Sequence, residues 1–194
     1  MKLPKTAHTA HAWRIHELTP DFRVQDVWSF RTPGAGPGDF PAMLTAMRAT
    51  GGLRDQSRPV RLLFALRWRI GALLGWDDPA RAAASLRERL PADLRRAPRG
   101  HDSPGLPLKA LYELRTESAR ELANRTGHCV MHLGWAPAAD GHELRMAVLV
   151  KPRGRFGRLY MAAIAPFRHL IVYPALTRRW ERAWREHATA GGAR

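Results

Sequence analysis

Two histidines, His128 and His132, stand four residues apart, and of all the pairs in the chain they come closest to metal-ligand spacing. On a helix this spacing would place both imidazoles on one face, where they could bind one zinc ion. The neighbouring Gly127, Val130 and Gly134 indicate a strand instead. Two Cα atoms four residues apart in a strand are about 13 Å apart, too far to share one metal ion. We therefore expect no metal site here. The two histidines share a sheet face, where they either line a site or are surface or hydrogen-bonded histidines.

A cysteine–histidine dyad is a second hypothesis, because Cys129 directly follows His128. Adjacent residues of a strand point to opposite faces of the sheet, so these two side chains cannot form a dyad. Cys129 shares its face with Met131, Leu133 and Trp135, and we expect it to be a small core residue.

Acid–base chemistry has candidates on the last predicted helix. Tyr160, His169 and Tyr173 could bond a ligand or transfer a proton if that helix borders a cavity, and His128 is a fourth candidate. The acidic residues in or near the strands have no spacing typical of acid–base catalysis, so we expect solvent-facing ion pairs. These acidic residues are Glu113, Glu117, Glu121 and Glu143.

Two rows of apolar side chains on neighbouring predicted strands could form either core or the wall of a cavity. The first row is Cys129, Met131, Leu133 and Trp135, and the second is Leu144, Met146, Val148 and Val150. Periodicity alone favours core. Methionine adapts to varied ligands and tryptophan offers a stacking surface, so a cavity wall remains the alternative.

The chain that must position these residues begins with a strand and helices. Residues 1–12 are predicted to be a mobile tail and residues 21–30 a first strand. The glycines of residues 33–38 form a loop rather than a dinucleotide site, since Pro37 removes a needed amide and no parallel βαβ pattern surrounds it. We expect helices over residues 39–50, 60–75 and 80–90 and a loop over residues 95–107. The second helix has one apolar stripe, with arginines on the other side; the stripe consists of Leu62, Leu63, Leu66, Ile70, Leu73 and Leu74.

Alternating strands and a long helix complete the chain. Strands are predicted over residues 111–115, 119–125, 127–135 and 143–151, and Asp140-Gly141 indicates an antiparallel hairpin between the last two. In the following helix, Pro166 and Pro174 each remove a backbone hydrogen bond, which predicts a kink near both.

That helix is apolar enough over residues 159–176 to raise the question of a membrane span. Arg168 and His169 lie in its middle, and a central arginine costs about 2.5–3.5 kcal/mol on insertion. A buried amphipathic helix is therefore the favoured interpretation. A helix lying on a membrane surface is the alternative, because Trp180 and Trp184 stand beside several arginines.

Composition bounds the class of protein. At 194 residues we expect one domain, and one cysteine without an apolar leader indicates a reducing, cytoplasmic location. The formal net charge is +15, but the arginines are spread along the whole chain and no nucleic-acid-binding motif accompanies them. We expect solvated charge and no specific nucleic acid.

Four runs carry a family resemblance; they are Ala123–His128, His132–Trp135, Met146–Pro152 and Tyr160–Pro174. They closely resemble a family of uncharacterised bacterial domains that looks like part of the helix-grip (SRPBCC) superfamily. That superfamily includes START lipid-transfer domains, birch-pollen-allergen-type proteins and polyketide cyclases. The resemblance implies an α+β fold, with a curved antiparallel sheet wrapped around a long kinked C-terminal helix and short helices after the first strand. It also implies a ligand cavity between sheet and helix. The domain would span residues 13–187, between mobile tails at 1–12 and 188–194.

The function expected from this resemblance is binding of a small apolar or aromatic molecule, polyketide-like or lipid-like. The expected cavity residues are Tyr112, Met131, Leu133, Trp135, Met146, Val148, Ile164 and Phe167. A cyclase or dehydratase acting in the same cavity is the alternative, with Tyr160, His169, Tyr173 and His128 as its catalytic groups. A peripheral membrane module using the basic C-terminal helix is the second alternative. We expect no metal or organic cofactor, NAD included, and a monomer or homodimer.

Overall fold

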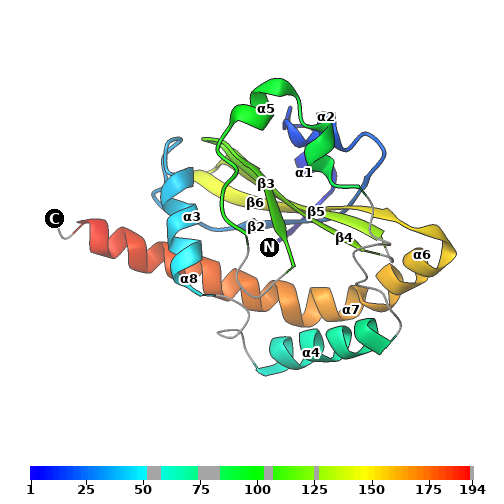
Figure 1. Cartoon of the computed structure of the whole chain (residues 1–194). Helices are drawn as coiled ribbons and strands as arrows, with labels where there is room; N and C mark the ends of the chain where they lie inside the picture. The colour runs from blue at the N-terminus through cyan, green and yellow to red at the C-terminus, as the bar shows by residue number, and fades with distance from the viewer. Residues whose placement is uncertain (52–57, 74–83, 103–106, 125–126, 193–194) are drawn as a thin grey trace.

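A computed structural model describes residues 1–51, 58–73, 84–102, 107–124 and 127–192, and it has the predicted α+β architecture (Figure 1). Six antiparallel strands form one sheet in the order β1-β2-β6-β5-β4-β3. The strands are β1 (Lys2–Leu3), β2 (Arg23–Phe30), β3 (Lys109–Glu113), β4 (Glu117–Asn124), β5 (Gly127–Ala138) and β6 (Gly141–Pro152). The antiparallel prediction for the last four strands is confirmed, and β2 joins them through β6.

The turn between β5 and β6 is tighter than the predicted connection. Ala138 pairs with Gly141, so Ala139 and Asp140 alone lie between the paired residues. Gly141 has a φ of +115°, a backbone conformation that residues other than glycine rarely adopt. This explains why glycine stands at this position.

One face of the sheet carries a long, bent C-terminal helix, as predicted. Its parts are α6 (Gly154–Ala163), α7 (Ala165–Phe167), a π-helical turn η4 (Arg168–Val172) and α8 (Tyr173–Gly192). The predicted kinks lie where the prolines stand: α7 contains Pro166, and the wide turn η4 is followed at once by Tyr173 and Pro174. Because Pro174 has no N–H to bond the Leu170 carbonyl, a regular α-turn cannot close there.

Two further helices lie on this side of the sheet (Figure 1). Helix α3 (Phe40–Ala49) packs against α8, and α4 (Arg58–Leu73) lies along the C-terminal helix and contacts η4. Both fall where helices are predicted. The predicted apolar stripe of α4 is not buried at Leu62 and Leu66, because both side chains are exposed.

The opposite face is covered by short elements (Figure 1). They are α1 (Thr6–Thr9), α2 (Ile15–Leu18), the 3₁₀ turn η3 (Leu86–Arg89) and α5 (Ala92–Arg96). A helix is predicted over residues 80–90. Residues 80–83 lie outside the described residues, and the 3₁₀ turn η3 takes the place of the rest. The first two residues of the loop predicted over 95–107 belong to α5.

The two chain ends are more ordered than predicted. Residues 1–12, predicted to be a mobile tail, form β1 and α1, and β1 pairs with β2. The ordering of this segment follows from the burial of His8, which is only 1% exposed. At the other end α8 continues through residue 188 to Gly192.

Two apolar clusters lie on opposite sides of the sheet. On the helix side, Trp135 and Met146 pack with Phe40, Trp180 and Trp184; on the other side, Val130 and Leu149 pack with the short elements. Trp180 and Trp184 are therefore buried against the sheet, and the expectation that they would meet a membrane surface is wrong.

Among the described helices, Gly154–Ala190 is long and apolar enough to cross a membrane by length and composition alone. A core helix that meets the same criteria is mostly buried, whereas only 6% of the apolar window of this helix is buried, so the expected burial is wrong for that window. The second half of the helix packs on the sheet through Tyr173, Trp180 and Trp184.

Candidate functional site

A buried carboxylate, Asp26 of β2, is the centre of a polar cluster on the helix side of the sheet. It is only 3% exposed and faces the C-terminal helix together with Trp28. A strand irregularity between Val24 and Asp26 turns the two side chains to opposite faces. Without that irregularity an acidic residue two positions from Val24 would share its apolar face.

Three groups of the C-terminal helix converge on Asp26. His169 Nε2 lies 2.8 Å from Asp26 Oδ1, and the Tyr173 hydroxyl donates to Oδ2 at 2.9 Å. Arg168 Nη2 lies 3.3 Å from Oδ2. The wide turn η4 contributes the arginine and the histidine, and Tyr173 follows it directly. In a π-turn, residues five apart are in register, so Arg168 and Tyr173 can approach one carboxylate.

The surroundings of Tyr173 determine the protonation state of its hydroxyl. Burial, together with the nearby Asp26 carboxylate, raises the pKa of Tyr173 above its ordinary value. The phenol therefore remains protonated and acts as a donor. Burial also raises the pKa of the Cys129 thiol to about 11, so this cysteine is not a nucleophile at neutral pH.

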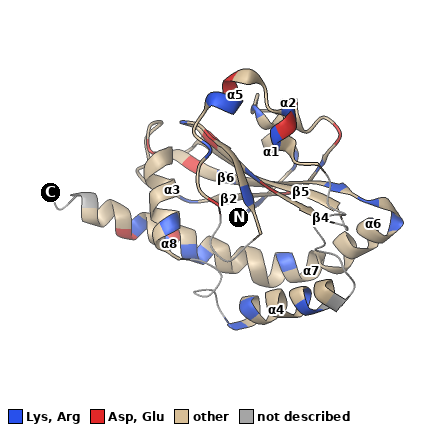
Figure 2. Ribbon diagram, viewed as in Figure 1, with Lys and Arg blue, Asp and Glu red and all other residues tan. Residues whose placement is uncertain are grey.

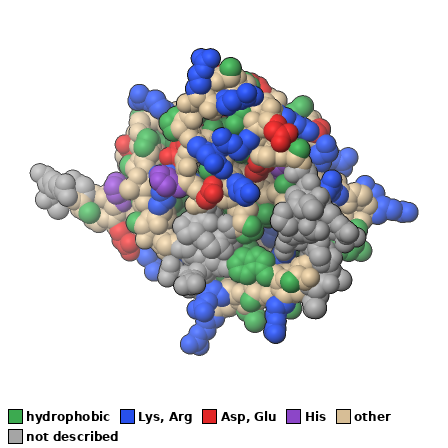
Figure 3. Space-filling model, in the orientation of Figure 1, with side chains coloured by type: hydrophobic (Ala, Val, Ile, Leu, Met, Phe, Trp, Pro, Cys, Tyr) green, Lys and Arg blue, Asp and Glu red, His purple; other side chains and the backbone are tan. Residues whose placement is uncertain are grey.

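The strands beside this cluster are only partly covered. Met131, Val148 and Trp28 face the helix from the middle of the sheet, yet each remains partly accessible, as does Cys129. These four side chains define the partly open region of this sheet face. Figure 3 shows the exposed side chains of one face of the molecule, with blue Lys and Arg beside green hydrophobic side chains at the lower edge, where Figure 1 places α4.

The predicted site residues divide between the two faces of the sheet. His169 and Tyr173 meet at Asp26, while Met131 and Val148 border the partly open region. Leu133, Trp135 and Met146 lie on the same face but are fully packed in the core. Tyr160, Ile164 and Phe167 lie on the C-terminal helix, the first two half-buried and the third exposed.

Tyr112 and His128 do not join this site, because they point to the opposite face. The Tyr112 hydroxyl donates to Glu117 Oε2 at 3.1 Å, and His128 Nε2 lies 2.7 Å from Glu121 Oε2. The prediction that they would line one site with Met131 or His169 is therefore wrong. The expectation of solvent-facing ion pairs is also wrong for Glu117 and Glu121, which are both buried. Glu113 and Glu143 form partly exposed ion pairs with Arg48 and Arg145.

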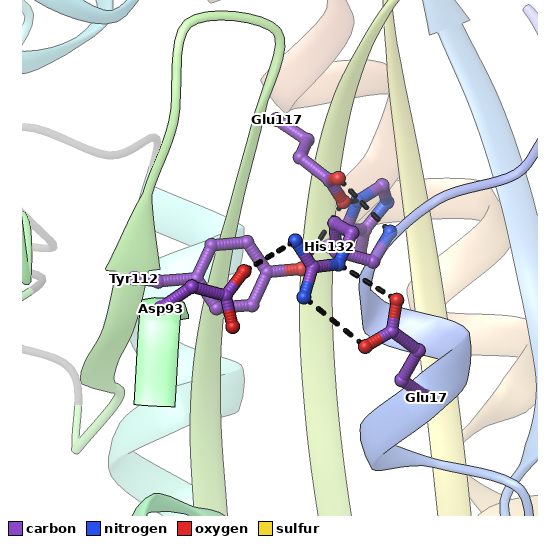
Figure 4. Close-up of polar contacts among 6 residues, drawn as sticks. Glu17, Asp93, Tyr112, Glu117 and His132 are labelled. Atoms are coloured by element: carbon purple, nitrogen blue, oxygen red, sulfur yellow. Dashed lines mark hydrogen bonds and ion pairs between the residues drawn. The ribbon is translucent and has the colours of Figure 1, made fainter. Parts of the chain in front are cut away.

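The network around Glu117 holds the N-terminal segment on the sheet. Figure 4 shows Glu117 between Tyr112 and His132, and His132 Nε2 lies 2.8 Å from Glu117 Oε2. His132 Nδ1 is in turn 3.1 Å from His8 Nε2. Because an ionised carboxylate only accepts, His132 donates through Nε2 and accepts through Nδ1, and His8 donates.

The pKa values in this network follow from burial and pairing. Burial lowers the pKa of His8 to about 3 and also lowers that of His132, so both rings are neutral at physiological pH. Burial opposes ionisation of Glu117, but hydrogen bonds from His132, the Arg14 backbone and Tyr112 outweigh it and lower the pKa of this carboxyl. At neutral pH these groups therefore keep fixed protonation states, and the network holds the N-terminal segment on the sheet.

The two histidines of β5 have separate hydrogen-bond partners. His128 and His132 bind different glutamates, and no group of three or more His, Cys, Asp or Glu in the described ranges could hold a metal ion.

Comparison with known proteins gives a family but no activity. The family model described as "Protein of unknown function (DUF2867)" matches residues 18–175, most of the chain. The chain belongs to the DUF2867 family. The matched region of this DUF2867 protein includes Asp26, Arg168, His169 and Tyr173, and it excludes His8. No curated protein and no solved structure matches the chain.

Sequence reasoning missed Asp26 and Arg168. The signal for Asp26 is an acidic residue inside the imperfect alternation of the first strand, where Val24 and Val27, being an odd number of positions apart, cannot share a face without a bulge. In the sequence Arg168 stands out only as an obstacle to membrane insertion, although an arginine next to a histidine in an apolar helix is also a sign of a functional site.

Proposed function

We propose that this DUF2867 domain binds a small apolar or aromatic molecule between the sheet and the C-terminal helix, and that Arg168 bonds an acceptor oxygen of that molecule. The observation that carries the proposal is that Arg168 has buried N–H groups without a hydrogen-bond acceptor among the described residues. Its Nε and Nη2 atoms are enclosed by protein, yet neither makes a hydrogen bond with the described part of the chain. The ion pair with Asp26 at 3.3 Å satisfies the charge but not these donors.

The chemistry of the surrounding side chains supports this class of ligand. Trp28, Met131 and Val148 offer an apolar wall, and the guanidinium provides planar donors that suit a carbonyl or carboxylate. A curved sheet around a C-terminal helix is also the arrangement expected of the helix-grip superfamily, and we propose membership on that ground.

The test is to fill the partly open region with a larger side chain. An anionic aromatic dye, anilinonaphthalene sulfonate, serves as the probe in a fluorescence titration. Val148→Trp should weaken dye binding by about tenfold or more, because the added ring occupies the space beside Met131. Ala139→Trp, at the exposed β5–β6 turn, is the control and should bind the dye as the wild type does.

Arg168→Gln separates the polar contact from the apolar wall. Removing the positive charge should weaken the anionic dye by about tenfold but leave an uncharged anilinonaphthalene within about twofold. Unchanged dye binding in both Val148→Trp and Arg168→Gln would refute the proposal. If Val148→Trp fails to fold, Met131→Phe fills the same region. Met146→Trp is unsuitable, since Met146 is part of the packed core.

A cyclase or dehydratase is the second candidate, and the contact between Asp26 and His169 favours it. A carboxylate beside an imidazole is the pair used in general acid–base catalysis, and Tyr173 stands beside it as a protonated donor. Native mass spectrometry of wild type and His169→Ala, purified from the same host, distinguishes the two functions. A dehydratase variant should retain a molecule heavier by one water than the molecule in the wild type. A cyclase variant should retain a molecule of the same mass that gives different fragments. If both proteins retain the same bound molecule, the domain binds that molecule without converting it.

A further inference from the structure

The outer surface of α4 and of the first half of the C-terminal helix is apolar. Leu62 and Leu66 of α4 are 71% and 53% exposed, and Leu159 and Leu170 of the C-terminal helix are 69% and 76% exposed. Phe156 and Phe167 are also about half exposed. Single exposed apolar residues are ordinary, but several large ones on two adjacent helices are typical of an interaction site. We call these six side chains the apolar patch.

These side chains form continuous stripes rather than isolated positions. The exposed stripe of the C-terminal helix also contains Ala162, Ala163 and Pro166, and that of α4 contains Ala65 and Ala72. A helix that covers a sheet normally presents polar residues outward. Here both helices, which lie along one another in the outer layer, present apolar stripes (Figure 1).

Arginines border this apolar patch, and acidic residues are missing from both helical segments. Residues 58–73 and 153–180 contain ten arginines and no aspartate or glutamate. Most of these arginines are exposed: Arg58, Arg61, Arg69, Arg153, Arg155, Arg158 and Arg178. Figure 2 shows positive but no negative charge along α4, α6 and α7, in contrast to the mixed charges over α2. The acids nearest to α4 in sequence, Asp55 and Asp77, lie outside the described residues.

We propose that this patch docks the protein on the surface of an anionic membrane, with the exposed leucines entering the interface and the arginines meeting lipid phosphates. Apolar insertion and electrostatic attraction to anionic lipid together determine the strength of such binding. The surface is distinct from the tryptophan-bearing end of the helix, and it is independent of the proposed ligand site.

The packing of α8 favours a helix that lies on the membrane rather than one that crosses it. Tyr173, Trp180 and Trp184 are buried against the sheet, and withdrawing the helix would leave Asp26 without its three partners. An unpaired buried carboxylate is costly.

The charge pattern also favours lipid over a second copy of the chain. Two copies meeting through this patch would bring their arginines together without an acidic residue from either helix. Anionic lipid phosphates supply the opposite charge.

The experiment is flotation of the full chain with vesicles of phosphatidylcholine alone or with one third phosphatidylglycerol. We expect binding to the anionic vesicles at least about tenfold stronger than to the neutral ones, and weakened by 0.5 M salt. Leu62→Glu/Leu170→Glu should reduce binding to the anionic vesicles by about tenfold or more. Both positions are exposed, so the variant should fold.

The control changes charge by the same amount away from the patch. Ala139→Glu/Ala190→Glu, at exposed positions of the β5–β6 turn and the end of α8, should retain binding within about twofold. Equal binding by the two double variants would overturn the proposal, as would equal binding to neutral and anionic vesicles. Concentration-dependent dimerisation that only Leu62→Glu/Leu170→Glu abolishes would assign the patch to a second copy. If alkaline carbonate does not release the bound protein from the vesicles, the C-terminal helix spans the membrane and the proposal is wrong.

Discussion

At the scale of single residues, the molecule places its buried charges on two sides of one sheet. Asp26 faces the helix with Arg168, His169 and Tyr173 around it, whereas Glu117 faces the N-terminal segment. The first cluster includes a cation with unsatisfied donors and borders a partly open region. The second has neutral histidines and is closed. This difference, rather than the residue types, separates a candidate site from a structural network.

Replacing Asp26 by asparagine should destabilise the protein by about 3 kcal/mol. The change leaves Arg168 enclosed without a countercharge, and breaking a buried pair from one side has a cost of this size. Chemical denaturation of the variant and wild type measures it. The double variant Asp26→Asn/Arg168→Gln should recover part of the loss, and a double variant less stable than Asp26→Asn would contradict this interpretation.

Acid should loosen the N-terminal segment before it unfolds the sheet. The folded-state pKa of His8, about 3, lies below its ordinary value, so between about pH 6.5 and 3 the unfolded chain binds a proton that the folded chain excludes. Stability should therefore fall with decreasing pH in that window, by about 1.4 kcal/mol per pH unit for each such histidine.

Thermal melts of wild type and His8→Leu between pH 7 and 5 check this effect. The variant should be less dependent on pH, because its side chain cannot bind a proton. Parallel pH profiles for both proteins would exclude His8 as the titrating group. The lowered pKa values of Glu117 and Glu121 add a further loss only below about pH 4.5.

At the scale of elements, the wide turn η4 aligns the helix with the sheet. A π-turn contains one residue more than an α-turn, and Leu170, one of its five residues, is exposed. The extra residue lets Arg168 and His169 reach Asp26 while α8 keeps Trp180 and Trp184 on the core. Two separate contacts thus depend on a single irregularity.

Deleting Leu170 should convert the wide turn into a regular α-turn. We expect the chain to stay folded with nearly the same helical circular dichroism, while Arg168 and His169 rotate by about 100° relative to α8 and dye binding is lost. Deleting Leu159, an equally exposed leucine in α6, is the matched control and should destabilise the protein more, since no wide turn absorbs it. Equal stability losses in the two deletions would show that η4 has no such role.

At the scale of the whole molecule, periodicity predicts the sheet and its covering helix, because both depend on local repeats of residue type. It fails where tertiary contacts override the local pattern. Asp26 needs the bulge after Val24, and residues 1–12 become ordered through a histidine whose partner is more than a hundred residues away. Periodicity assigns Leu62 to a core because apolar spacing cannot distinguish a buried helix face from one exposed for a partner.

Removing residues 1–12 should lower the free energy of unfolding by about 2 kcal/mol or more, since it exposes His132 and removes β1 from the sheet edge. Dye binding on the helix side should be retained. A chain ending at His187, which removes the exposed residues 188–190 and those after them, is the control and should melt within a few degrees of the wild type. A protein lacking residues 1–12 that melts like the full chain would restore the mobile-tail interpretation.

The pairing of β2 with β6 has a consequence for the order in which the chain folds. Strands β3 to β6 are neighbours in sequence and can pair as soon as they leave the ribosome, but β2 must wait for β6, and Asp26 must wait for residues 168–173. Its carboxylate therefore stays hydrated through most of synthesis and loses water only when the last helix closes. A nascent chain released before residue 173 would have nearly its whole sheet but no assembled site.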